Sequence, residues 1–224
     1  MLKKIAYRAG MIGTAVFTVS FVVNGFLRPD YNPVLNYISE LAIGPIGWIQ
    51  IVSFLFLGVS IILFSFGVRA AFHTGRASRA APVLFLIIGI SYILSGLFVT
   101  DPQAMFDNQQ TPHGVIHGIV GALVFSLSAI CCFVLWRRFR IDKEWQSMSV
   151  FSFVAGTVMT ILIVLMKIGQ LHTGLLHDWA GIVQRCCLIT SYVWIFLLSY
   201  KISNEMIDNK YGRYIRQNHY WRSR

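Results

Sequence analysis

The stretch IGWIQIVSFLFLGVSIILFSFGV, residues 46–68, decides the fold class because it contains no charged side chain. A helix of about 20 mostly apolar residues is long enough to span the hydrocarbon core of a bilayer. Five other stretches have the same apolar character: 10–27, 82–100, 114–136, 148–168 and 179–200. The chain is 56% hydrophobic and 12% charged, whereas soluble domains carry about 25% charged residues. The sequence therefore predicts one all-α membrane domain, residues 1–224, built as a six-transmembrane-helix bundle.

The stretch 10–27 resembles a signal peptide, because Lys3, Lys4 and Arg8 precede it. No small-residue cleavage pattern follows it, and the apolar run continues to Leu27. We therefore expect this segment to be retained as the first helix of the bundle.

The net charge of +10 follows the predicted topology. Of the 19 lysine and arginine residues, 16 lie before the first span, between the second and third, between the fourth and fifth, or in the basic tail 201–224. Basic residues mark the cytoplasmic loops of membrane proteins, so we expect a multi-pass protein of the cell membrane with both termini in the cytoplasm. Anionic lipid headgroups account for the basic charge. The expected partners are membrane lipids, and no nucleic acid is expected.

The predicted outer loops carry signs of local structure. The segment VLNYISELAI, residues 34–43, repeats apolar side chains at helical spacing, which predicts a short amphipathic helix at the outer interface after the first span. Thr111 followed by Pro112 is typical of a helix start. Asp178 is a suitable N-cap for the last span.

Ionisable side chains gather on the same predicted outer side: Glu40, Asp101, Asp107, His113, His117, His172, His177, Asp178 and Arg185. His113 and His117 are four residues apart, so one helix face presents both imidazoles, and such a pair can hold a divalent metal such as zinc. The candidate further ligands are His172, His177, Asp101 and Asp178. Two alternatives are a hydrogen-bonded helix end beside Asp101 and a haem or proton-relay role.

Three side chains are candidate catalytic groups: Ser39, Glu40 and Asp101. A carboxylate beside a histidine or a metal can act as a general base for water. Arg185 is a candidate substrate-binding residue, because ionisable groups inside membranes are costly and mark functional sites. It could instead pair with Glu40 or Asp101, or extend to the headgroups. Three helices would also begin on this side, and their N-terminal ends favour an anionic group.

The motifs NPVLNYISELAIGPIGWI, LFVTDP and HGVIHGIVGALVF resemble those of the bacterial and archaeal membrane family called domain of unknown function 998. The resemblance extends from the first span to the last, and it implies about six spans and a membrane location but no activity. The Ser, Asp and His content is similar to that of the alkaline ceramidase and haemolysin-III-like membrane hydrolases. Those proteins have seven spans, with their paired histidines in the last one, so the likeness is one of chemistry.

These features favour a metal-assisted hydrolase that acts on a lipid or lipid-linked anionic substrate at the outer leaflet. His113, His117 and one of His172 or His177 would hold the metal, Glu40 or Asp101 would activate water, and Arg185 would bind an anionic group. The alternative is a non-enzymatic protein, either a proton-linked transporter or a membrane sensor or accessory protein. A third possibility is haem or quinone redox chemistry.

Overall fold

The structure, a computed structural model, describes residues 2–102, 110–169 and 176–222. Side chains are described up to Met206, except that of His177. Within these ranges the chain is all helical and contains no strand. The long helices are α1 (Leu2–Phe26), α2 (Trp48–Ala71), α3 (Ala80–Leu97), α4 (Pro112–Phe139), α5 (Gln146–Gly169) and α6 (Ala180–Arg222).

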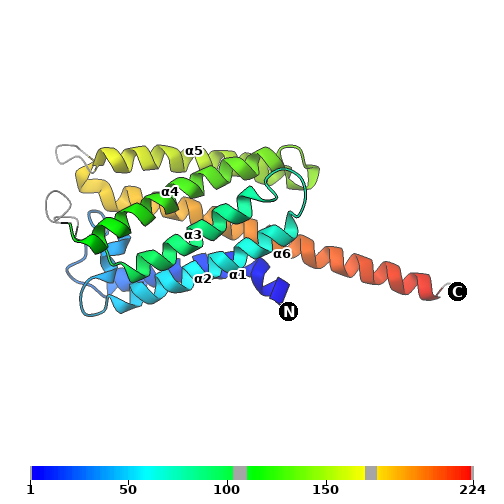
Figure 1. Ribbon diagram of the computed structural model, residues 1–224, viewed down its shortest axis with the longest axis horizontal. Coiled ribbons are helices and arrows are strands. Elements are labelled where there is room, and N and C mark those ends of the chain that lie inside the picture. The colour runs from blue at the N-terminus through cyan, green and yellow to red at the C-terminus, as the bar shows by residue number, and fades with distance from the viewer. Residues whose placement is uncertain (1, 103–109, 170–175, 223–224) are drawn as a thin grey trace.

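Each of the six predicted spans is confirmed as a helix that is long and apolar enough to cross a membrane. The protein is therefore a multi-pass membrane protein. The first helix is longer than its apolar run, because it begins at Leu2 and carries Lys3, Lys4 and Arg8 on its first turns. The last helix is longer too, and Figure 1 shows it continuing beyond the bundle toward the C-terminus.

The six helices form a ring in chain order. Each helix packs against the one before it and the one after it, and α6 returns to pack against α1. Aromatic side chains fill the interior of the ring. The ring of Phe17 lies 5.2 Å from that of Phe54 and 5.6 Å from that of Tyr192, centroid to centroid, and such contacts add to the free energy of apolar packing.

Two glycines allow α2 and α3 to cross closely. A Cβ atom placed on Gly58 would lie 2.7 Å from the carbonyl oxygen of Gly89. The reverse is also true, because a Cβ on Gly89 would lie 2.8 Å from the carbonyl oxygen of Gly58. Small residues allow helix backbones to approach this closely in membranes, where van der Waals packing drives association.

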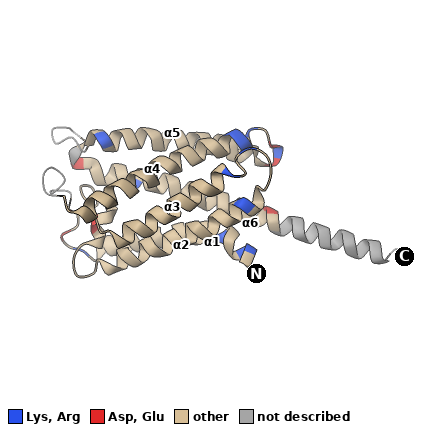
Figure 2. Cartoon of the chain, in the orientation of Figure 1, with Lys and Arg blue, Asp and Glu red and all other residues tan. Residues whose placement is uncertain are grey.

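The two ends of the bundle differ in charge. Figure 2 shows that the lysine and arginine residues lie mainly at the end that carries the N-terminus. The opposite end, at the left in Figure 1, is where α2, α4 and α6 begin. A small cavity lies inside the ring toward this end, and we call it the cavity end. From the positive-inside rule, we expect the cavity end to face away from the cytoplasm.

The connector between α1 and α2 contains a short helix, as predicted, but a 3-10 helix over fewer residues. Only Ile38–Ala42 is helical, as the 3-10 helix η1, and all five of its residues are buried. It packs against α1, α2 and α6 within the cavity end of the ring. Protein groups satisfy part of its main chain. The amide of Ile38, for example, donates to the Oε1 of Gln184 at 2.8 Å.

Candidate functional site: a polar cavity at one end of the ring

A small cavity lies inside the ring, with η1 forming part of its wall. Its volume is about 40 Å³, enough for two or three water molecules at roughly 10–15 Å³ each. Apolar side chains from η1, α2, α4 and α6 form most of its wall. The polar side chains that line it are Ser39, Tyr92, Ser95, His117 and Gln184. A cavity with several convergent polar groups in an apolar frame is a candidate binding or catalytic site.

His117 is held by the end of the neighbouring helix. Its Nδ1 lies 2.8 Å from the carbonyl oxygen of Phe98, the residue that follows α3. The last carbonyls of a helix lack partners within it, so this oxygen is available. A carbonyl can only accept, so Nδ1 carries the proton and Nε2 is the acceptor of the neutral ring. The ring edge also packs against Phe54, with 6.1 Å between centroids.

Ser39 and Gln184 both line the cavity, and a hydrogen bond between Ile38 and Gln184 holds their segments together. The Oε1 of Gln184 accepts from the main-chain amide of Ile38, which precedes Ser39. The NH₂ group of Gln184 is therefore the end of the amide that can donate to a group in the cavity. Ser39 is buried beside it. The predicted residues Ser39 and His117 thus line one cavity although 78 positions separate them in the sequence.

Asp101 is buried, and it joins the end of α3 to the start of α4. Its carboxylate accepts from the amide of Thr111 at 2.7 Å and from the hydroxyl of Thr111 at 2.8 Å. The same hydroxyl accepts from the amide of Gly114 at 3.1 Å, and Pro112 is the first helical residue. The predicted Thr111 cap is confirmed. Gly114 packs directly against the carboxylate, where no side chain would fit.

Glu40 organises the connector. Its carboxylate accepts from the amide of Tyr37 at 2.8 Å and from the side-chain NH₂ of Asn36 at 3.2 Å. Its main-chain oxygen accepts from Arg28, which also donates to the carbonyl of Ile43. The carboxylate therefore closes the first turn of η1, and Ser39 is the neighbour that lines the cavity.

Arg185 fastens the connector to α6. Its guanidinium donates to the carbonyl oxygens of Asn36 at 2.8 Å and Gly181 at 2.9 Å, and to the hydroxyl of Tyr31. The guanidinium also lies 5.4 Å from the centre of the Tyr31 ring. Burial raises the pKa of Tyr31, so its hydroxyl remains a neutral partner at physiological pH. These contacts give Arg185 a positioning role.

The other predicted metal ligands are not gathered in the same way. His113 is exposed, and its ring packs 5.4 Å from that of Phe98. Asp178 is exposed within the 3-10 turn η4 (His177–Trp179), before α6 begins at Ala180. Asp107, His172 and the side chain of His177 lie outside the described residues. Among the residues that are described, no three His, Cys, Asp or Glu side chains group as metal ligands.

Residues 11–201 match the family described as a protein of unknown function, DUF998. The chain belongs to the DUF998 family. Neither the curated proteins nor the solved structures contain a match. In this DUF998 protein the motifs that carried the resemblance meet at the cavity end, because Ser39 and His117 line the cavity and Asp101 lies at the start of α4.

The sequence does not single out Gln184, Tyr92 or Ser95, although all three line the cavity of this DUF998 protein. Serine and tyrosine occur throughout the spans, so no spacing distinguishes these two. Gln184 offers one signal, since an amide within an apolar span often forms a hydrogen bond to a neighbouring segment. Its partner, the amide of Ile38, lies 146 residues away and has no sequence signature.

Proposed function

We propose that this DUF998 protein is a membrane-embedded hydrolase that acts on a lipid or lipid-linked anionic substrate at the cavity end, in the outer leaflet. One observation carries the proposal. His117 has its Nδ1 proton committed to Phe98, and its ring lines a cavity with the hydroxyl of Ser39 and the amide of Gln184. A histidine that main-chain oxygens of Phe98 and Ser95 orient at a cavity is a candidate general base, which would accept a proton through Nε2.

The chemistry follows from these three groups. The hydroxyl of Ser39, or a water in the cavity, attacks the carbonyl or phosphoryl centre of the substrate, and Nε2 of His117 takes its proton. The NH₂ group of Gln184 donates to the oxygen on which negative charge develops. His117 then gives the proton to the oxygen of the leaving group. If Ser39 is the nucleophile, a water molecule repeats the sequence and releases the acyl or phosphoryl group.

A metal ion would be an alternative to this mechanism, because Nε2 of His117 cannot both hold a metal and accept the proton. His113 and His117 stand one turn apart on α4, and His172 or His177 would complete the set. Zinc held there would lower the pKa of a bound water. Elemental analysis of the detergent-purified protein, wild type beside His113→Ala/His117→Ala, tests this alternative. Stoichiometric metal that is lost in the variant supports it, and metal-free active protein contradicts it.

Access to the cavity offers a matched pair of variants. A Cβ on Gly121, which lines the cavity, would meet nothing within 4 Å, and the same is true of Gly118, which does not line it. Gly121→Leu should therefore fill the approach to the cavity without disturbing the helix packing. Gly118→Leu adds the same bulk elsewhere on α4 and serves as its control.

The test is hydrolysis of a mixture of labelled lipids by the protein in proteoliposomes. We expect His117→Gln and Ser39→Ala each to lower the rate at least 100-fold, in line with the loss of a general base or nucleophile. Gly121→Leu should lower it by a smaller factor, and Gly118→Leu should leave it unchanged. Full activity in His117→Gln, with or without added metal, contradicts the proposal.

A second candidate, a proton-linked transporter or sensor, has its own supporting observation. Tyr92 lines the cavity, and its hydroxyl donates to the hydroxyl of Tyr192 at 3.1 Å in the fully buried interior. The hydroxyls of Ser128 and Ser191 are also buried there without a protein partner. Proton flux into proteoliposomes that is lost in Tyr92→Phe would favour this function. Hydrolysis unaffected by the same substitution would separate the two candidates.

A further inference from the structure

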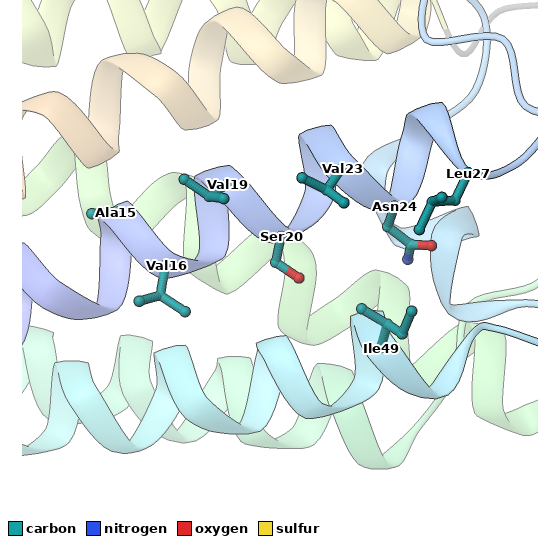
Figure 3. Close-up of a pocket in the computed structure, with 8 residues that line it drawn as sticks. All are labelled: Ala15, Val16, Val19, Ser20, Val23, Asn24, Leu27 and Ile49. Atoms are coloured by element: carbon teal, nitrogen blue, oxygen red, sulfur yellow. The ribbon is translucent and has the colours of Figure 1, made fainter.

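A groove runs along the membrane-facing side of α1 and is lined by two polar side chains, Ser20 and Asn24. Its volume is about 460 Å³, and its lining is almost entirely apolar. Figure 3 shows the residues that line it: Ala15, Val16, Val19, Ser20, Val23, Asn24, Leu27 and Ile49. Val19 and Leu27 are more than half exposed, and in a multi-pass membrane protein such a surface faces hydrocarbon.

Asn24 is the exceptional member of this lining. It is fully buried, and neither its Nδ2 nor its Oδ1 has a hydrogen-bond partner in the protein. The other polar side chain of the groove is satisfied, because the hydroxyl of Ser20 lies 2.5 Å from that of Ser53. An unpaired amide in an apolar medium is costly, and no bulk water reaches the hydrocarbon region to satisfy it. The amide of Asn24 therefore lacks a hydrogen-bond partner, and a molecule bound in the groove could supply one.

The depth of Asn24 identifies that occupant. From Ala15 to Leu27 the groove follows about 18 Å of helix axis at 1.5 Å per residue, close to the roughly 15 Å hydrocarbon thickness of one leaflet. Asn24 lies about 3 Å of helix rise before the end of α1 at Phe26, and Arg28 is the first charged residue after that helix. The headgroup zone is about 5–8 Å thick on each side of a bilayer. We therefore infer that Asn24 lies at the depth where the ester groups of a glycerolipid join the acyl chains.

We propose that this groove binds one acyl chain of a glycerolipid, and that the NH₂ group of Asn24 donates to the ester carbonyl of that chain. The chain covers the exposed valines, and its carbonyl supplies the acceptor that the protein lacks. Leu27 and Ile49 flank the amide (Figure 3) and would enclose the carbonyl. This site is separate from the polar cavity, and the inference holds whether or not the protein is a hydrolase.

The test compares two lipids that differ only in the carbonyl. Delipidated protein in detergent is titrated with phosphatidylglycerol whose chains are ester-linked or ether-linked, and the rise in melting temperature is followed against lipid concentration. One net hydrogen bond predicts that the ester lipid half-saturates the protein at a roughly two- to tenfold lower concentration. Equal half-saturation by the two lipids in the wild type overturns the proposal.

Three variants make the test specific. Asn24→Leu removes an unpaired amide, so it should fold, and it should lose the preference for the ester lipid. Gln50→Leu is its matched control. Gln50 is also fully buried with both amide atoms unpartnered, but it does not line the groove, so the preference should persist. Val19→Trp should fill the groove and abolish stabilisation by both lipids.

Two outcomes count against the site. If Asn24→Leu kept the preference for the ester lipid, a residue other than Asn24 would bind the ester carbonyl. A change from dimer to monomer in Val19→Trp, measured by light scattering, would assign the groove to a second copy of the chain. A negative result in this lipid-binding test would not contradict the hydrolase proposal. That proposal is tested separately, by the rate of lipid hydrolysis in the His117 and Ser39 variants.

Discussion

At the scale of single residues, Asp101 shows how a buried carboxylate can be committed to structure. We expect Asp101→Ala to lower the free energy of unfolding by about 1–3 kcal/mol, because the amide and hydroxyl of Thr111 lose their acceptor at the start of α4. Thermal unfolding in detergent measures this effect. Asp101→Asn retains an acceptor oxygen and should cost less. An unchanged melting temperature in Asp101→Ala would contradict the assignment.

Arg185 allows a similar separation of structure from substrate binding. Its guanidinium holds three oxygens of the connector and α6. We expect Arg185→Met to destabilise the protein by about 2 kcal/mol or more and to expose the segment 28–47 to proteolysis. Arg185→Lys should rescue little of this loss, because an ammonium cannot reproduce the planar fork. If Arg185→Met kept its stability and resisted proteolysis while losing affinity for anionic lipid, Arg185 would be a substrate-binding residue.

The pool of candidate residues could be predicted from the sequence, whereas their arrangement could not. Ionisable side chains in apolar spans are conspicuous, so His117 and Arg185 stand out. Whether such a side chain faces a cavity or a main-chain carbonyl depends on contacts that are distant in sequence. The partner of His117 is the carbonyl of Phe98, and a main-chain oxygen carries no residue-type signal.

At the scale of helices, the crossing of α2 and α3 should be sensitive to one methyl group. We expect Gly58→Ala to destabilise the bundle by about 1–3 kcal/mol, because the new Cβ would press against the carbonyl of Gly89. Gly118→Ala is the matched control. It adds the same atom where nothing lies within 4 Å, and the better helix propensity of alanine should make it neutral or slightly stabilising. Equal stability of the two variants would show that this crossing tolerates separation.

The connector marks the limit of periodicity as a predictor of elements. Apolar spacing over residues 34–43 predicted a helix at the interface, and the structure has the buried 3-10 helix Ile38–Ala42. Periodicity identifies which side chains seek an apolar environment, but a stripe that faces lipid and one that faces protein look alike. The main-chain bonds to Gln184 and Arg28 decided the outcome.

At the scale of the whole molecule, the charge asymmetry predicts which end faces the cytoplasm. In a variant without the native cysteines, we expect Asp30→Cys to react with a membrane-impermeant maleimide added to intact cells. Ile141→Cys, at the other end of the bundle, should react only after permeabilisation. Both positions are exposed. The reverse pattern of labelling would invert the topology and place the cavity end in the cytoplasm.

The membrane class and the six helices were accessible from the sequence, because hydropathy over about 20 residues reports directly on the solvent of each segment. The order of helices around the ring was not accessible. Lateral neighbours are chosen by close packing, as at Gly58 and Gly89, and small residues occur on many faces of these helices.

Because every helix packs on its predecessor, the chain can assemble in the order in which the ribosome delivers it. Each new hairpin docks on a neighbour already in the membrane, and such a topology favours local contacts and fast folding. The contacts that α6 makes with α1 and with the connector must wait until α6 has been made. Gln184 and Arg185 belong to α6, so the wall of the cavity and the hydrogen bonds to the connector form together when that helix docks.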